Sequence, residues 1–258
     1  MAFKSRPRTP TASSHRYAAG VTLVELAVVI SIVGLLSVTV SAGYTDYAQV
    51  RAAAGAKADA EVARQAVRAF VLRNKRLPCP DLSALGDAAR EGATGSCPAG
   101  AQVGWLPYES LGLMRPDRGA RMRYAVSRTA SVDLVAPAAA GSGVDLDGTA
   151  RLRATLVAAA RLPNGSDRPF LTGPGLPGAP ENCAAVQSNP AFALIAPVSD
   201  RDNAGGAAAG FDGVNFAMAA SNRNCIAAPS RPMDARYDDV VVAESASALL
   251  GWLATQTR

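Results

Sequence analysis

The sequence predicts an α+β fold in which one long N-terminal helix packs on an antiparallel sheet. An apolar run at residues 21–43 is followed by an alanine-rich segment without proline at residues 44–74, and both patterns are typical of helix. From residue 75 to residue 258, glycine and proline recur every few residues and the apolar stretches are short. This second pattern predicts a globular region of strands and long loops.

Residues 1–20 form a basic leader ahead of the apolar run. Its charged residues are all basic: Lys4, Arg6, Arg8 and Arg16. As a helix, residues 21–43 would extend about 34 Å, slightly more than the hydrocarbon thickness of a bilayer. Because positive charge stays on the cytoplasmic side, we expect a single-pass helix in the inner membrane, with residues 44–258 exported to the periplasm.

A cleaved secretory signal is the alternative interpretation of the same run. Release after Ala42 would leave a soluble, secreted binding domain. The apolar core of such a signal is about 7–15 residues long. The run in this chain is longer and carries Glu25, so the sequence favours a membrane helix.

Residues 44–74 are expected to continue the helix as an amphipathic segment. Six apolar residues at helical spacing would form the face that packs on the sheet: Val50, Ala54, Ala58, Val62, Ala66 and Ala69. From residue 21 to residue 74 the helix would be about 80 Å long, far longer than one domain requires. Half of it is therefore expected to serve as a stalk.

Pro78 and Pro80 are expected to end the helix, because two prolines so close together exclude helical continuation. Beyond them we expect short strands and a closing amphipathic helix. The expected strands are residues 122–128, 152–160, 191–196, 214–218 and 239–243, and the expected helix is residues 246–254.

The composition excludes several classes of enzyme. The one histidine, His15, lies in the leader, so the body of the protein has no histidine to act as acid, base or metal ligand. Neither G-x-S-x-G nor S-x-x-K occurs. We therefore expect a non-enzymatic protein without a cofactor.

The net charge gives little reason to expect a nucleic-acid partner. Removal of the leader would leave 22 basic against 21 acidic side chains.

The cysteines favour disulfides over a metal site. Cys79, Cys97, Cys183 and Cys225 form an even set without a C-x-x-C pair, as expected for an exported chain. Three pairings are possible. The local one, Cys79–Cys97 with Cys183–Cys225, is favoured, and closing its shorter loop would contribute about 3 kcal/mol in the chain-entropy model. The sequence alone leaves the pairing open.

Glu25 is the unusual residue of the apolar run. An unpaired carboxylate near the centre of a membrane helix costs about 2.5–3.5 kcal/mol. One explanation places Glu25 near the interface and the helix N-terminus, where the helix dipole reduces this cost. The other requires cleavage just ahead of the run, so that the Glu25 carboxylate of one subunit pairs with the new α-ammonium of its neighbour.

The residues around Glu25 resemble a known processing signal. Gly20 ends the leader, V-T-L-V-E-L follows from Val21 to Leu26, and Gly34 lies inside the helix. This combination resembles the class III signal of type IV prepilins and type II secretion pseudoprepilins. The resemblance implies that prepilin peptidase cleaves between Gly20 and Val21 and methylates the Val21 amine, and that Glu25 guides subunit assembly.

The same resemblance implies the partners and the final location. The partners would be prepilin peptidase, other pilin or pseudopilin subunits, an inner-membrane assembly platform and, before assembly, the lipid of the inner membrane. The mature chain would enter a periplasmic or extracellular filament. Two positions depart from the family pattern: Val21 stands where phenylalanine is usual, and Ala42 lies near the place of a helix-kinking proline.

A second resemblance lies in the region beyond the helix. L-P-C-P-D at residues 77–81, a second cysteine, G-W-L-P at residues 104–107 and a strand containing Tyr124 follow one another. This order is similar to that of the exported domains of some larger minor pilins and pseudopilins. We therefore expect a structural minor subunit of a type IV pilus or a type II secretion pseudopilus.

Two acidic loops are candidate calcium sites. Asp145 with Asp147, and Asp200 with Asp202, place carboxylates at alternate positions, and some pseudopilins bind calcium near the C-terminal end of this domain. Neither loop completes an EF-hand, so ordinary turns are the preferred interpretation. Asp238 and Asp239 are adjacent at the entry to an expected strand, which predicts that their side chains point to opposite faces and share no site.

A group of arginines makes DNA an alternative partner. Some minor pilins of competence systems bind DNA, and five arginines gather in one segment: Arg115, Arg118, Arg121, Arg123 and Arg128. Arg121 and Arg123 are alternate residues of an expected strand and therefore share one face of it. Exposure of this face to solvent explains the pattern more simply than DNA binding does. A DNA-binding competence pilin and a membrane-anchored periplasmic binding domain are the alternatives to the structural subunit.

Overall fold

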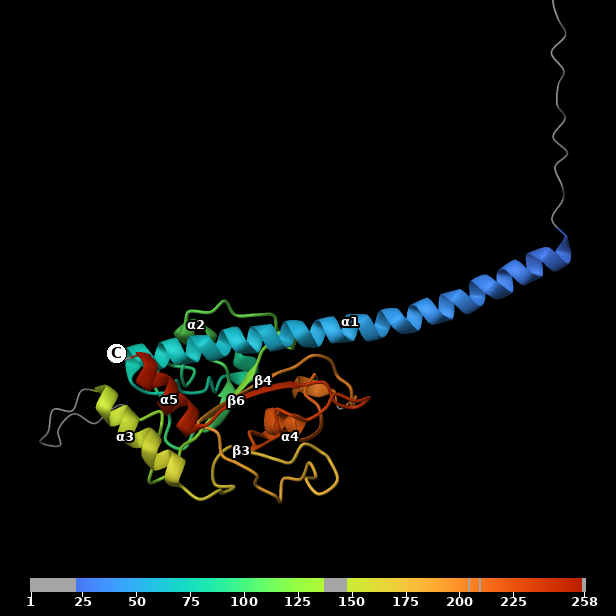
Figure 1. Cartoon of the computed structure of the whole chain (residues 1–258). Coiled ribbons are helices and arrows are strands. Elements are labelled where there is room, and N and C mark those ends of the chain that lie inside the picture. The colour runs from blue at the N-terminus through green and yellow to red at the C-terminus, as the bar shows by residue number, and fades with distance from the viewer. Residues whose placement is uncertain (1–21, 137–147, 204, 209, 257–258) are drawn as a thin grey trace, which may run out of the picture. The chain divides into compact units, whose positions relative to one another are not determined.

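The structure is a computed structural model that describes residues 22–136, 148–203, 205–208 and 210–256 (Figure 1). Its internal contacts divide the chain into two units, Met1–Ala48 and Gln49–Arg258. Helix α1, Leu23–Asn74, runs through the boundary between them. All other helices and strands that the structure describes belong to the second unit, which has the α+β class expected from the sequence.

Helix α1 ends where the sequence predicts. Arg73 in its last turn complements the negative end of the helix dipole. Lys75 then adopts a left-handed conformation with φ of 54°, and Pro78 and Pro80 prevent the helix from resuming.

One part of the fold-class prediction is contradicted. Among the residues that the structure describes, none of the helices combines the length and the apolar character needed to cross a membrane. The side chains of residues 38–46 lie outside the description. The predicted membrane half at residues 21–43 is therefore wrong for this structure.

A four-stranded antiparallel sheet is the centre of the second unit. Its order is β1 (Val103–Trp105), β2 (Arg123–Val126), β4 (Phe192–Ala196) and β6 (Val240–Glu244). The strands are buried along almost their whole length, which explains their nearly continuous apolar sequences. Arg123 is opposite Trp105 on one side of it and Ile195 on the other, so these three side chains share one face of the sheet.

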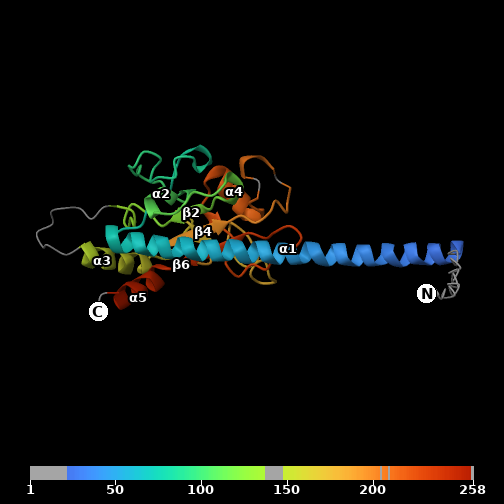
Figure 2. The ribbon, with the colours of Figure 1, turned by 90° about the horizontal axis from the view of Figure 1, so that it is seen from above.

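The second half of α1 covers one face of this sheet (Figure 2). The buried core on this face includes five apolar side chains of α1 that are at most 4% exposed: Ala60, Ala63, Val67, Phe70 and Val71. They share a core with the side chains that alternate strand residues direct to this face: Tyr124, Val126, Phe192, Leu194, Val240 and Val242. The sheet and the helix therefore form two layers, as expected from the sequence.

The buried face of α1 is not the predicted one. Val50 and Val62 are 67% and 58% exposed, and of the other predicted positions only Ala66 is half-buried. Four of the six predicted residues are alanines, whereas the buried face includes Phe70, Val67 and Val71. Larger side chains remove more apolar area from water, so the rotation of the helix that buries them is favoured.

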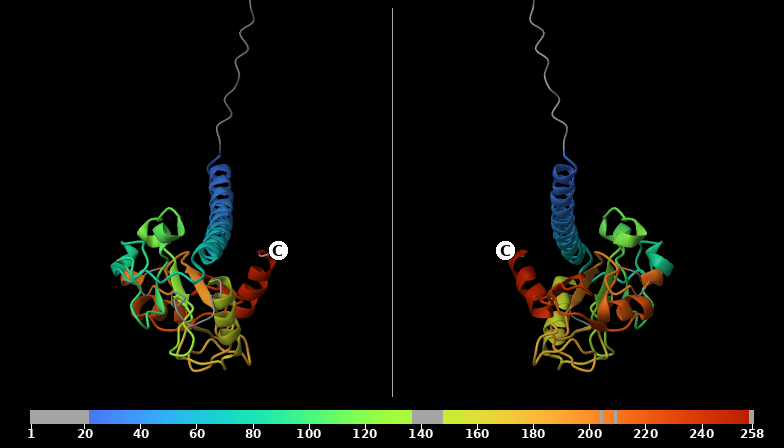
Figure 3. Two further views of the ribbon diagram at one scale, coloured as in Figure 1. Left: turned by 90° about the vertical axis from the view of Figure 1, so that its left-hand side faces the viewer. Right: turned by 90° about the vertical axis from the view of Figure 1, so that its right-hand side faces the viewer.

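Two helices complete the layer on the α1 side. Helix α3 (Gly148–Arg161) contacts helix α5 (Ala246–Gln256), and both add leucines to the same core: Leu152, Leu156, Leu249 and Leu253. Figure 3 shows α5 on one side of α1 and the segment of α2 (Tyr108–Leu111) on the other. Helix α5 includes the predicted residues 246–254.

The opposite face of the sheet carries a second core. It is covered by helix α4 (Gly213–Ser221) and a small parallel sheet of β3 (Phe170–Leu171) and β5 (Cys225–Ile226). The core includes Trp105, Phe211, Met218 and Ile226. Short 3-10 turns lie at Ala84–Gly86, Arg118–Ala120 and Gly206–Ala208.

Two predicted strands are helices. Residues 152–160 lie within α3, where Leu152 and Leu156, one helical turn apart, are buried. Residues 214–218 lie within α4, whose left-handed C-cap is Asn222. Runs of this length fit either structure, and the tertiary contacts select the helix. The other three predicted strands contain or overlap β2, β4 and β6.

Candidate functional site

The residues of the expected processing signal lie at the start of the chain. Gly20 and Val21 are outside the described residues. Glu25 lies in the first turn of α1, where a carboxylate complements the positive end of the helix dipole, and its backbone N–H donates to Thr22 Oγ1 at 3.2 Å. The Glu25 side chain is exposed.

The side chains that surround Glu25 form an exposed apolar surface. Each of the following is at least 52% exposed: Leu23, Val24, Leu26, Val28, Val29, Ile30, Ile32, Val33, Leu35 and Leu36. Ser31 and Ser37 donate their hydroxyls to the carbonyls of Ala27 and Val33 within the helix. Apolar exposure on this scale marks a surface that another apolar surface covers. We name residues 23–36 the apolar segment.

A cluster of carboxylates lies in the second unit, at the start of β6. Asp212, Asp238 and Asp239 are at most 5% exposed, and one oxygen of each lies within 4.8 Å of the others. Asp212 is also within that distance of Asp200 and Asp202, which are half-buried. The loop ahead of α4 and the chain entering β6 thus meet at Asp212, a residue that the sequence analysis did not identify.

The three buried carboxylates are held mainly by backbone N–H groups. Asp212 accepts hydrogen bonds from the N–H groups of Arg201 and Asp238 at 2.9 and 3.0 Å, and its own N–H donates to Asp239 Oδ2 at 2.9 Å. Asp238 accepts from Ser199 and from Nε of Arg201 at 2.9 Å. The cluster therefore connects the loop at residues 199–212 to the two residues that precede β6.

Burial shifts the protonation of two members of this cluster, Asp239 and Asp212, toward the neutral form. It raises the pKa of Asp239 well above its usual value, because desolvation penalises the charged form more than the hydrogen bonds from Asp212 and Asn215 favour it. Burial also raises the pKa of Asp212. Asp239 Oδ1 is buried without a hydrogen-bond partner in the described structure.

The carboxylate cluster bears on two predictions, the separation of Asp238 from Asp239 and the candidate calcium sites. Asp238 and Asp239 are expected from the sequence to share no site, but both lie next to Asp212. The Asp212 carboxylate accepts a hydrogen bond from the Asp238 N–H, and the Asp212 N–H donates to the Asp239 carboxylate. Their side chains still have separate partners. The carboxylate oxygens of Asp200, Asp202 and Asp212 are ligands of the type that calcium prefers. Calcium binding by this loop stays a prediction. Asp145 and Asp147 lie outside the described residues.

The disulfides follow the local pairing. Cys79 is bonded to Cys97, and Cys183 is bonded to Cys225. The first bond closes the loop after α1, and the second attaches the loop before β4 to β5 in the second core.

The arginine group is engaged within the chain. Arg118 and Arg121 both pair with Asp87, and Arg128 pairs with Asp133 at 2.7 Å. Arg121 and Arg123 are only 5% and 3% exposed, so the predicted solvated strand face is wrong. Arg123 is buried against Trp105. The alternation of arginines in the sequence does not predict this contact.

Comparisons with protein-family models, with curated proteins and with solved structures give no match to this chain.

Proposed function

We propose that this chain is a structural, non-enzymatic subunit of a filament of the type IV pilus or type II secretion pseudopilus kind. The observation that carries the proposal is the apolar segment of α1, residues 23–36, with its single acidic residue, Glu25. The motif from Gly20 to Leu26 supports it by resemblance. The filament would assemble outside the cytoplasm, which agrees with two disulfides.

The proposed mechanism is packing between helices. Exposed leucine, isoleucine and valine side chains of the apolar segment would be buried against the same segment of neighbouring subunits. Burial of one such side chain contributes about 1.5–3 kcal/mol. Since a helix buried on all sides needs apolar residues on all sides, the distribution of these residues around α1 fits a filament core better than a one-sided contact.

Glu25 would set the axial register of the subunits. Cleavage between Gly20 and Val21 creates an α-ammonium on Val21, four residues before Glu25. An unpaired carboxylate is strongly disfavoured in an apolar core, so the packing in which Glu25 meets a neighbour's ammonium is selected over shifted packings.

Processing is tested by mass spectrometry of the mature N-terminus. A chain that begins at methylated Val21 supports the proposal, whereas a chain that begins at Gly43 contradicts it. Gly20→Ala should slow the cleavage, and a larger residue at position 20 should block it, seen as an unshifted band on a gel.

Assembly is tested with Glu25→Gln in cells that carry the partner subunits. We expect normal processing but at least ~10-fold less of the chain in the sheared filament fraction, because the amide cannot neutralise the ammonium. Glu61→Gln is the matched control on the same helix, where the carboxylate contacts Arg64. Equal incorporation of both variants would exclude the role of Glu25.

A further inference from the structure

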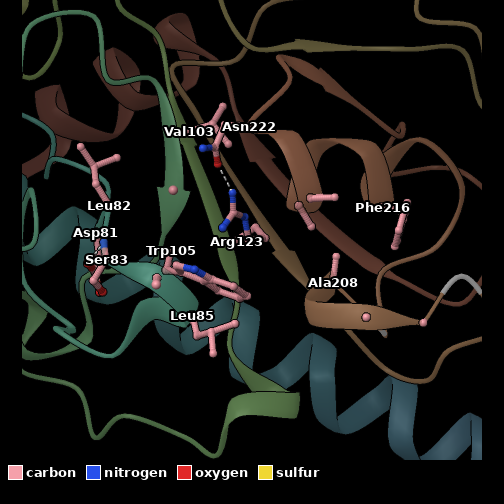
Figure 4. A pocket seen from close by; sticks show the side chains of 16 residues that line it. Asp81, Leu82, Ser83, Leu85, Val103, Trp105, Arg123, Ala208, Phe216 and Asn222 are labelled. Carbon is pink, nitrogen blue, oxygen red and sulfur yellow. Dashed lines mark hydrogen bonds between the residues drawn. The ribbon is translucent and has the colours of Figure 1, made fainter.

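A cavity of about 580 Å³ opens next to the edge strand β1 (Figure 4). Its walls come from residues 81–85, from β1 and β2, and from the segment that includes Gly206 and α4. Its size lies in the range of small-molecule sites, ~300–1,000 Å³. All of its lining residues belong to the second unit.

Arg123 is the cation in the wall of this cavity. Its side chain comes from β2, and its guanidinium carbon lies 4.6 Å from the centroid of the Trp105 ring. One terminal nitrogen donates to Asn222 Oδ1, the contact drawn in Figure 4. Nε of Arg123 is buried and has no hydrogen-bond partner in the described structure.

The charge of Arg123 is not compensated by a carboxylate, unlike that of comparable arginines. Of the four arginines that are buried in the described part of the chain, Arg121, Arg128 and Arg168 each pair with an aspartate at 2.7 or 2.8 Å. No ion pair to Arg123 is present among the described residues. The Asp81 carboxylate acts on Arg123 through its charge, which opposes the effect of burial on the pKa. The Asp81 oxygens accept the N–H groups of Ser83 and Ala89 instead.

Burial makes this cation costly to keep. Desolvation lowers the pKa of Arg123 to about 10, which still leaves the guanidinium charged at neutral pH. Stacking of the guanidinium on the Trp105 ring offsets part of this cost. A buried charge that lacks an anionic partner is uncommon in folded proteins, and here it lies in the wall of a cavity.

The rest of the wall is mostly apolar. Apart from Arg123, the side chains that line the cavity are predominantly aliphatic or aromatic: Leu82, Leu85, Val103, Trp105, Ala208, Phe216, Ala219 and Ala220. Asp81, Ser83 and Asn222 are the polar exceptions. A ligand that matches this lining carries a single negative charge next to an apolar group.

We propose that this cavity binds a carboxylate joined to an apolar group, with the carboxylate on Arg123 and the apolar group against Leu85, Val103 and Phe216. A phosphate dianion fits less well, because the described lining has no second cation and includes the Asp81 carboxylate. Two sources share this chemistry: a free apolar carboxylic acid and the C-terminal carboxylate of a polypeptide. The proposal does not rest on the filament role.

Fluorescence of Trp105 provides a direct binding assay. The chain has two tryptophans, so Trp252→Phe leaves Trp105 as the only tryptophan reporter next to the cavity. Phenylacetate is titrated into the full-length Trp252→Phe chain, with phenylacetamide as its uncharged match. An N-acetylated dipeptide ending in leucine is titrated as the free acid and as the C-terminal amide.

Each acid is expected to bind at least ~10-fold more tightly than its amide, as a charge-assisted hydrogen bond predicts. Tighter binding of the dipeptide acid than of phenylacetate would identify a polypeptide terminus as the source, and the reverse order would identify a free acid. Equal affinity of acid and amide, or no saturable response up to millimolar concentration, would overturn the proposal.

Three variants locate the carboxylate. Arg123→Met should remove the preference for acid over amide, while Arg90→Met, which removes an exposed arginine outside the cavity wall, should retain it. Asn222→Asp keeps Arg123 and places a carboxylate beside it, so it should weaken acid binding by a similar factor. Aspartate tolerates the left-handed conformation of residue 222, so Asn222→Asp is expected to fold. This variant therefore tests the position of the carboxylate even where Arg123→Met fails to fold. Unchanged acid binding by folded Asn222→Asp would contradict the assignment.

Discussion

Arg68 on α1 and Glu244 at the end of β6 form an ion pair that joins residues 176 positions apart. Nε and Nη2 of Arg68 donate to the carboxylate at 2.9–3.1 Å, and Glu244 is 3% exposed. The same guanidinium lies over the Trp252 ring of α5, 5.1 Å from its centroid. One side chain thus links the long helix, the sheet and the last helix.

We predict that Arg68→Met lowers the free energy of unfolding by about 3 kcal/mol at pH 7, because it leaves the Glu244 carboxylate buried without its partner. Urea denaturation followed by circular dichroism measures the change. Arg64→Met is the control. Its partner Glu61 keeps 40% of its side chain exposed, so the loss should stay below about 1 kcal/mol. Adding Glu244→Gln to Arg68→Met should restore part of the loss. Equal effects of the two single variants would contradict the importance of the buried pair.

Two glycines distinguish backbone strain from a steric clash. Gly86 and Gly112 have φ values of 68° and 74°, but a Cβ on Gly86 would lie 2.7 Å from Trp105 Cγ, whereas a Cβ on Gly112 would meet nothing within 4 Å. We predict that Gly112→Ala costs about 1–2 kcal/mol and that Gly86→Ala costs clearly more. Urea midpoints of the two variants test this. A smaller loss for Gly86→Ala would show that Trp105 moves aside freely.

The disulfides should differ in their contribution to stability. The bond between Cys79 and Cys97 spans 18 residues, and the bond between Cys183 and Cys225 spans 42. The chain-entropy model predicts losses of about 3 and 4 kcal/mol when each pair is replaced by alanines. Denaturation without reductant measures both. The opposite order would show that local packing, rather than loop length, dominates.

Asp239 should make stability depend on pH. The folded chain raises the Asp239 pKa, so it holds this proton more tightly than the unfolded chain, whose aspartate pKa is about 3.9. The stabilisation is therefore complete below that pH and is lost as the pH rises through the folded-state pKa. Asp239→Asn imitates the neutral form, so its stability relative to the natural chain should increase from pH 4 to pH 8.

Thermal unfolding at several pH values measures this difference between Asp239→Asn and the natural chain. Asp117→Asn, an exposed position elsewhere on the surface, is the control, and its difference from the natural chain should stay nearly constant. A constant difference for Asp239→Asn would show that Asp239 is already ionised in the folded protein at acid pH.

Local chemistry explains which features could be predicted. The end of α1, the positions of β2, β4, β6 and α5, and the disulfide pairing depend on prolines, on short apolar runs and on neighbouring cysteines. Residues 152–160 and 214–218 were assigned to strands, because short apolar segments have no intrinsic preference strong enough to exclude either structure.

Local sequence patterns are enough to predict that the chain is α+β and that α1 stops before Pro78, and they identify Glu25 as the only charged residue in an apolar run. Three further features depend on how the elements pack together: which face of α1 is buried, the position of Asp212 beside Asp238 and Asp239, and the burial of Arg123 on Trp105. Periodicity describes how side chains alternate around one element. It does not say what that element faces, because the facing residues are distant in sequence and are brought together by burial of the whole core.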